Sequence, residues 1–141
     1  MTIDRIAASL DFDASALQLR SQRAQVLASN LANADTPNFK ARDFSFADAL
    51  REATGVASTA AGTAAAVPLV QTNPGHMTAG AATGGGPTLL YRTPMQSALD
   101  GNTVEPDVER SAFVDNSLRY QEGLKYMSNQ IKTLLTAVNG Q

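Results

Sequence analysis

The chain has 141 residues, enough for roughly one domain, and its 11 basic and 13 acidic side chains give a formal net charge of −2. This balance lacks the clustered basic excess of a nucleic-acid-binding protein. The absence of cysteine excludes disulfides, thiolate metal sites and a cysteine nucleophile. No apolar run reaches the roughly 18–20 residues that cross a bilayer, and the first residues lack a secretory signal. A cytoplasmic protein, or one exported without a cleaved signal peptide, is expected.

The N-terminal segment carries apolar side chains at helical spacing. Residues three, four and seven apart share one face of a helix, and the segment is rich in Ala, Leu, Gln and Arg, which favour helix. The apolar positions are Ile3, Ile6, Leu10, Leu17, Ala24, Leu27 and Leu31. The pattern predicts a helix from Thr2 to about Ala32, weakest at Asp11 to Asp13, within an N-terminal coiled-coil segment at residues 1–34.

A turn and an extended arm are expected in the first part of residues 35–52. Pro37 suits the second position of a β-turn, and Asn38 tolerates the left-handed conformation that a type II turn requires next. The alternation in residues 39–46 favours an extended strand or arm.

A short helix is predicted after the arm. Ser45 is a helix-capping residue, and Asp48 three positions later would complete a capping box. On such a helix Phe46 and Leu50 share a face, because residues four apart are neighbours. From the residues alone, this pair is expected to pack against the long helices.

Residues 53–90 form a low-complexity middle of mostly Ala, Gly, Thr, Ser and Pro, with no charged side chain from Ala53 to Tyr91. Such a composition buries too little apolar surface to offset the entropy lost on ordering. A flexible loop is therefore expected rather than a second domain. Val67–Val70 and Thr88–Tyr91 are its two short strand-like stretches.

The sequence offers no catalytic constellation. The single histidine, His76, lies in the low-complexity middle, where a solvent-exposed position is expected, and Gly84–Gly86 lacks the Lys and Ser/Thr of a phosphate-binding loop. A modest basic cluster consists of Arg20, Arg23, Lys40 and Arg42. A solvated face, or salt bridges to another subunit, explains this cluster better than nucleic acid. We expect no catalytic residues, cofactor, metal or small-molecule substrate.

The C-terminal segment has the most regular pattern in the chain. After an extended lead at residues 91–105, apolar positions alternate steps of four and three, which is the signal for coiled-coil pairing. These positions are Phe113, Ser117, Tyr120, Leu124, Met127, Ile131, Leu134 and Val138. Pro106 suits the first helical turn and Gly140 suits a C-terminal stop, which predicts a helix over residues 106–139. Asp107 and Glu109 would face the positive end of its dipole.

These segments together predict a mainly α-helical protein. The two long terminal helices pair as a coiled coil, with a short arm after the first helix and a flexible middle. The subunit-packing seam is expected at Leu10, Leu17, Leu27 and Leu31 together with the C-terminal heptad positions. A lone two-helix hairpin is marginal against the entropy of ordering it. The free chain is therefore expected to be partly unfolded until it assembles.

The residues from Ala28 to Phe39, ASNLANADTPNF, resemble the N-terminal signature of the axial proteins of the bacterial flagellum. Residues 16–23, 40–44 and 99–104, with Glu109, Asn116 and Tyr120, narrow the resemblance to the proximal rod proteins of the FlgB family. The signature turn and arm comprise Ser29, Asn30, Asn33, Asp35, Thr36, Pro37, Asn38 and Phe39. The family usually has Gly where this chain has Asn38, which can occupy the same left-handed turn.

The resemblance implies a structural subunit of the rod that crosses the periplasm. Such subunits pass unfolded through the flagellar type III export apparatus without a cleaved signal, and Phe46 to Leu50 fits their Phe-x-x-x-apolar export-gate element. Other copies of the chain, other proximal rod proteins and the adapter to the inner-membrane ring are the implied partners. The alternatives are another rod component, or a soluble helical adaptor or export chaperone.

Overall fold

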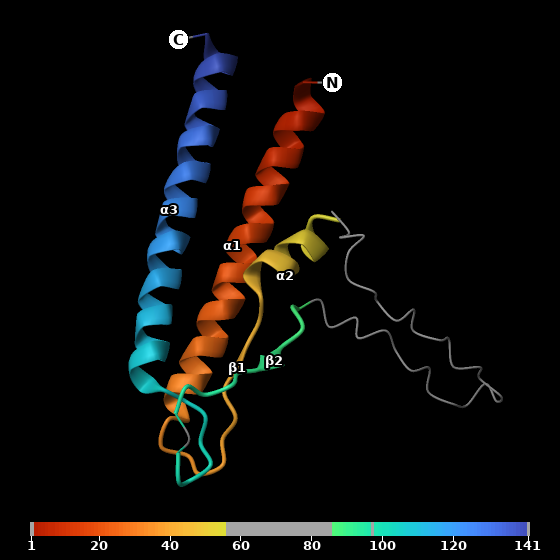
Figure 1. The fold of residues 1–141 in the computed structure, drawn as a ribbon. Helices are drawn as coiled ribbons and strands as arrows, with labels where there is room; N and C mark the ends of the chain where they lie inside the picture. Colours follow the sequence, from red (N-terminus) through yellow and green to blue (C-terminus); the bar gives the residue numbers. More distant parts are fainter. Residues whose placement is uncertain (1, 56–85, 97, 141) are drawn as a thin grey trace, which may run out of the picture.

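In the computed structural model, residues 2–55, 86–96 and 98–140 are described. The elements are α1 (Thr2–Ala32), β1 (Arg42–Asp43), α2 (Phe46–Ala53), β2 (Leu90–Tyr91) and α3 (Pro106–Asn139). The two long helices run side by side with both chain ends at the same end of the pair, and α2 lies on the other side of α1 from α3 (Figure 1). The mainly helical fold with paired terminal helices is the one predicted. His76, Val67–Val70 and most of the low-complexity middle lie outside the described residues.

Helix α1 is continuous through Asp11 to Asp13, where the sequence predicts its weakest part. Aspartate costs only a few tenths of a kcal/mol in a helix of good formers. Both acidic side chains remain partly or fully exposed to solvent. The helix is long enough to contact α3 along one face and the arm and α2 along another.

Helix α3 begins and ends where its sequence predicts. Pro106 occupies the first turn, where its missing N–H has no intrahelical acceptor to lose. Gly140 adopts a left-handed φ of 72°, and its N–H donates to the carbonyl of Thr136 at 3.1 Å. This is the expected glycine stop, because an L side chain rarely adopts that φ.

The hydrophobic cluster lies between α1, α2 and the arm. Leu19, Phe44 and Ala49 form its buried centre, and Val26, Phe46 and Leu50 pack against it. The predicted cap of α2 is present, since Ser45 Oγ accepts from the N–H of Asp48 at 3.4 Å. The carboxylate of Asp48 pairs with Arg51 on the same helix.

The predicted arm is mostly extended without being a long strand. Its regular part, β1, has two residues, and these pair antiparallel with β2 in the register Arg42 to Tyr91 and Asp43 to Leu90. The strand-like stretch expected at Thr88–Tyr91 therefore supplies the partner. The arm rises from the foot of the helix pair beside α1 and leads into α2 (Figure 1).

Candidate assembly interface and the junction that positions it

The signature turn has the predicted conformation. Asn38 has a φ of 61°, and the N–H of Phe39 donates to the carbonyl of Thr36 at 3.3 Å, which closes a β-turn around Pro37. The N–H of Asn38 donates to the carbonyl of Asp100 at 2.9 Å. The turn is thereby joined to the loop that precedes α3.

Asn102 holds the C-terminal end of α1 from that loop. Its Nδ2 donates to the carbonyls of Asn33, Ala34 and Thr36 at 3.1, 2.6 and 3.1 Å. Its Oδ1 accepts from the N–H of Val104 at 2.8 Å. These three carbonyls belong to the turn that follows α1, so this buried amide fixes the turn from a segment more than sixty residues away.

Two asparagines of the signature form hydrogen bonds, one to the arm and one within the end of α1. Asn30 exchanges two hydrogen bonds with the backbone of Arg42, donating from Nδ2 at 2.7 Å and accepting at Oδ1 at 3.2 Å. Asn33 Nδ2 donates to the carbonyl of Ser29 at 2.8 Å, and Thr36 Oγ1 lies 3.3 Å from Asn33 Oδ1. The signature therefore fixes where the chain leaves α1 and enters the arm. Ser29, Asp35 and Pro37 are exposed, and Phe39 is half-buried.

An ionic network joins α1, both strands and α3. Arg23 donates to Asp43 at 3.1 and 2.8 Å, and Arg92 pairs with both Asp43 at 3.1 Å and Glu109 at 2.5 Å. Glu109 is only 1% exposed and also accepts from Asn30 at 3.4 Å. The hydrogen bond to Asp43 raises the pKa of Arg23. From the sequence, Glu109 was explained by the helix dipole alone. The structure shows that it also forms a buried ion pair with Arg92. The only sign of this pair in the sequence is that Arg92 directly follows the residues of β2.

The basic side chains expected to cluster, those of Arg20, Arg23, Lys40 and Arg42, instead contact separate partners in the subunit. The guanidinium of Arg20 lies 4.4 Å from the ring centre of Phe46, and that of Arg42 lies 5.3 Å from the ring centre of Tyr91. Lys40 Nζ donates to the carbonyl of Gly101 at 2.6 Å. Burial lowers the pKa of Arg20, which still leaves it charged at neutral pH. The basic side chains therefore have partners inside the subunit.

Phe46 and Leu50, the pair matching an export-gate element, lie together on α2. Both are half-buried against the cluster centred on Leu19, Phe44 and Ala49. The packing expected from their spacing is thus present. Recognition by a gate would require the pair to leave this cluster.

The face of α3 that meets α1 is mostly small and polar. Its contacts recur every seven residues at Glu109, Asn116, Gly123 and Gln130, here termed the inner row. Asn116 Nδ2 donates to the carbonyl of Arg20 at 2.9 Å, and Gln130 Nε2 donates to Ser9 Oγ at 3.0 Å. A Cβ added at Gly123 would lie 3.0 Å from Leu17 Cδ2. The helices therefore approach closely here, without a large apolar core between them.

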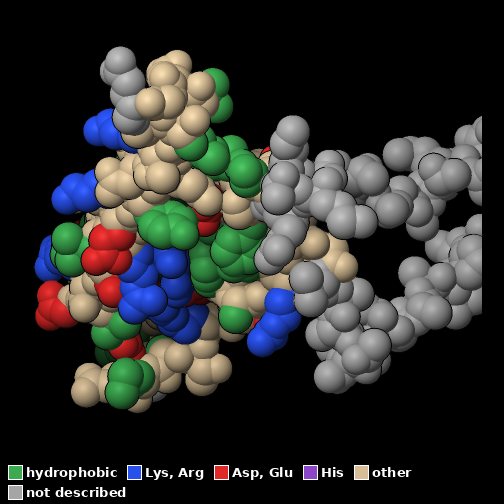
Figure 2. Space-filling model, turned by 90° about the horizontal axis from the view of Figure 1, so that it is seen from above, with side chains coloured by type: hydrophobic (Ala, Val, Ile, Leu, Met, Phe, Trp, Pro, Cys, Tyr) green, Lys and Arg blue, Asp and Glu red, His purple; other side chains and the backbone are tan. Residues whose placement is uncertain are grey.

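The predicted heptad positions of α3 fall into two groups, one partly covered by α1 and one exposed to solvent. Tyr120, Met127 and Leu134 are half-buried beside the inner row, as is Ser117. Phe113, Leu124, Ile131 and Val138, here termed the outer row, are 38%, 44%, 43% and 83% exposed. On α1, Leu27 is buried, and Leu10, Leu17 and Leu31 are half-buried. Seen from the end that carries both termini, hydrophobic side chains reach the surface between acidic and basic ones (Figure 2).

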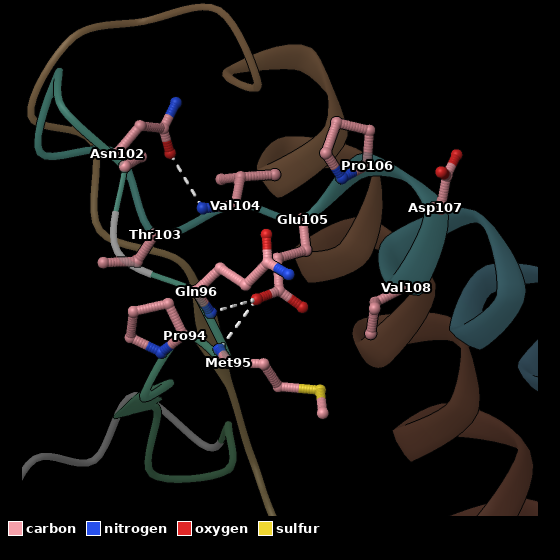
Figure 3. Close-up of a pocket in the computed structure, with 11 residues that line it drawn as sticks. Pro94, Met95, Gln96, Asn102, Thr103, Val104, Glu105, Pro106, Asp107 and Val108 are labelled. Atoms are coloured by element: carbon pink, nitrogen blue, oxygen red, sulfur yellow. Dashed lines mark hydrogen bonds between the residues drawn. The ribbon is translucent and has the colours of Figure 1, made fainter.

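An open groove of about 470 Å³ lies at the foot of the pair, between residues 94–98 and the start of α3 (Figure 3). Two carboxylates line the groove, those of Glu105 and Asp107. That of Glu105 accepts from the N–H groups of Met95 and Gln96 at 2.7 and 3.2 Å. These two hydrogen bonds tie Met95 and Gln96 to the residue that precedes α3. Across the described ranges, His, Asp and Glu do not gather in threes as a metal site requires.

Comparison with known proteins decides the family. A family model described as "Flagella basal body rod protein" matches residues 10–40, from the first third of α1 to the start of the arm. The flagellar basal body rod protein FlgB of Salmonella typhimurium strain LT2 is 44% identical over 138 residues, 98% of each chain. FlgB of Escherichia coli strain K12 is 44% identical over 136 residues, 96% of each chain. FlgB of Cereibacter sphaeroides is 42% identical over 132 residues, 94% of each chain.

The chain belongs to the FlgB family of flagellar basal body rod proteins. The family model covers the signature residues that form the turn and the arm in the structure. FlgB relatives match both terminal helices as well, because the alignments extend over nearly the whole chain. None of the helices in the described part is long and apolar enough to span a membrane.

Proposed function

We propose that this FlgB family member is a structural subunit of the proximal rod, polymerising through its two terminal helices into the tubular drive shaft of the flagellum. One observation carries this proposal: relatives named as flagellar basal body rod proteins match the chain from end to end. The exposed outer row of α3 supports it, since an apolar helix face left open in the subunit is suited to a neighbouring helix.

The small apolar core is a second line of support. In the described residues the buried hydrophobic side chains are Leu19, Leu27, Ala41, Phe44, Ala49 and Val104. Burial of the four larger side chains contributes on the order of 1.5–3 kcal/mol each and that of the two alanines less, whereas ordering a residue costs roughly 1–2 kcal/mol of backbone entropy. Helical hydrogen bonds offset part of that cost. The free subunit is marginal, and contacts between subunits supply the remaining stability.

The proposal includes the location of the protein in the cell and its binding partners. The chain is made in the cytoplasm, exported by the flagellar type III apparatus without a cleaved signal peptide, and incorporated into the basal body where the rod crosses the periplasm. Its neighbours are copies of itself, other proximal rod proteins and the adapter to the inner-membrane ring. The seam residues of both helices, from Leu10 to Leu31 and from Phe113 to Val138, form the subunit contacts.

Circular dichroism over a concentration series tests the polymerising behaviour. We expect low helicity in dilute solution and a severalfold rise as the protein polymerises, because the helices are completed by neighbours. A soluble adaptor or export chaperone would instead be a stable, discrete oligomer when dilute. Complementation separates rod components from one another: the gene should restore motility to cells lacking their FlgB and leave cells lacking a different rod protein immotile.

A further inference from the structure

Gly123 lies in the middle of α3 in a backbone conformation that does not require glycine. Gly55, Gly101 and Gly140 have a positive φ, which L side chains rarely adopt. Gly123 has no positive φ, and α3 is continuous through it. The residue therefore provides neither a turn nor a break in the helix.

Glycine is unfavourable at this position of α3. After proline it is the worst residue for the interior of a helix, because it loses the most backbone freedom on folding. Alanine at position 123 would favour the helix, above all in a dilute chain whose helices depend on intrinsic propensity. The reason for a glycine must therefore lie in a contact with another part of the subunit.

The contact at Gly123 is with Leu17 of α1. A Cβ added to Gly123 would lie 3.0 Å from Leu17 Cδ2 and 3.7 Å from Leu17 Cγ. The shorter distance is below the separation of about 3.5–4.0 Å at which two carbon atoms pack best. The half-buried side chain of Leu17 thus occupies the space that a side chain at position 123 would need.

Hydrogen bonds on both sides of this contact hold the two helices together. Seven residues before Gly123, Asn116 Nδ2 donates to the carbonyl of Arg20 at 2.9 Å. Seven residues after it, Gln130 Nε2 donates to Ser9 Oγ at 3.0 Å. Separation of the helices to admit a larger side chain would lengthen both bonds. The missing side chain at Gly123 is what lets these bonds form while Leu17 packs between them.

We propose that Gly123 is a positioning residue for assembly. Its lack of a side chain sets the distance between α1 and α3, which depends on the side chains at the contact. Leu124 of the outer row directly follows Gly123, so a shift of α3 here moves the outer row relative to neighbouring subunits. The inference rests on the proposed rod function and names a residue that acts on assembly through the α1–α3 contact.

Replacement of Gly123 by a larger residue should move helix formation and assembly in opposite directions. Purified Gly123→Ala and Gly123→Leu chains are followed by circular dichroism over a concentration series. We expect both to be more helical than the parent when dilute, because alanine and leucine favour helix. The concentration at which helicity rises on polymerisation should increase severalfold for Gly123→Ala and further for Gly123→Leu, because the added side chain overpacks the contact.

A size exchange identifies Leu17 as the side chain that Gly123 accommodates. Leu17→Ala combined with Gly123→Leu moves the large side chain from α1 to α3, so the variant should polymerise at a severalfold lower concentration than Gly123→Leu alone. Asn129→Ala is the matched control, since it favours helix at an exposed position outside the inner and outer rows. It should be more helical than the parent when dilute and polymerise at the parent's concentration.

Swarming of cells that lack their own FlgB separates this inference from the proposed function. The unaltered chain should restore swarming, Gly123→Leu should reduce it severalfold at an unchanged amount of exported protein, and the size exchange should recover most of the loss. Failure of the unaltered chain would overturn the proposed function itself.

Three results would overturn the role of Gly123 while the unaltered chain restores swarming. They are normal swarming by Gly123→Leu, a size-exchange variant as defective as Gly123→Leu, and a fall in dilute helicity on replacement by alanine. The last result would show that glycine serves the fold of α3 and not its distance from α1.

Discussion

At the scale of residues, buried polar side chains rather than apolar ones connect distant parts of this subunit. Asn30, Asn102 and Glu109 are each at least 95% buried. Each bonds a segment far away in the sequence. Removing one partner from such a network costs more than the bond itself contributes, because the remaining group stays buried without a partner. These residues fix geometry, and their contacts are sensitive to single changes.

The pair formed by Arg92 and Glu109 provides the test at this scale. Arg92→Ala leaves the Glu109 carboxylate buried with little compensation, so we expect about 3 kcal/mol of destabilisation. Thermal unfolding followed by circular dichroism, at a concentration where the parent is helical, measures it. The double variant Arg92→Met with Glu109→Leu should recover part of the loss. Arg51→Ala, which removes an exposed pair, should cost less than about 0.5 kcal/mol.

At the scale of elements, the short helix α2 combines a packing role with a proposed export role. Its side chains Phe46 and Leu50 cover the cluster that joins the arm to α1. In an unfolded chain the same two side chains are free for an export gate. The two roles belong to different states of the molecule, so one sequence pattern can serve both.

Replacing both Phe46 and Leu50 with Ala should lower the amount of exported protein severalfold without changing synthesis. Leu19→Ala is the matched control, since it damages the same cluster and leaves the proposed gate element intact. Immunoblots of cytoplasmic and exported fractions measure the effect. If the control reduces export equally, packing accounts for the result; if the double variant is exported normally, the gate role is lost.

At the scale of the whole molecule, the terminal helices have two kinds of surface. The inner row joins them within the subunit through small and polar contacts. The outer row leaves apolar side chains accessible. A change in the outer row should therefore affect assembly more than the fold of the subunit, and a change at a buried position should affect both.

Leu124→Asp and Ile131→Asp should abolish motility and leave the low helicity of the dilute chain equal to that of the parent, because both sites are substantially exposed in the free subunit. Leu27→Asp should instead lower the helicity of the dilute chain further, since this fully buried site cannot solvate a charge. Swarm assays and circular dichroism of the dilute purified variants separate the two effects. Motile cells carrying either outer-row variant would contradict the seam assignment.

The amino-acid sequence by itself determined the features that depend on neighbouring residues. The start of α3 at Pro106, its stop at Gly140, the Ser45 cap and the left-handed Asn38 follow from local sterics and hydrogen bonding, and they appear as predicted. The heptad pattern likewise indicated a long helix made for pairing. It could not indicate which flank of that helix meets α1, because Tyr120, Met127 and Leu134 suit either choice.

Only the tertiary structure decided the contacts between distant segments. It placed the polar inner row against α1, left the outer row exposed, and brought Arg92 to Glu109 and Asn102 to the end of α1. Each of these contacts depends on how the arm and the loop before α3 return the chain to the foot of the hairpin. That path is a property of the whole fold, since no local pattern encodes the distance between residues seventy positions apart.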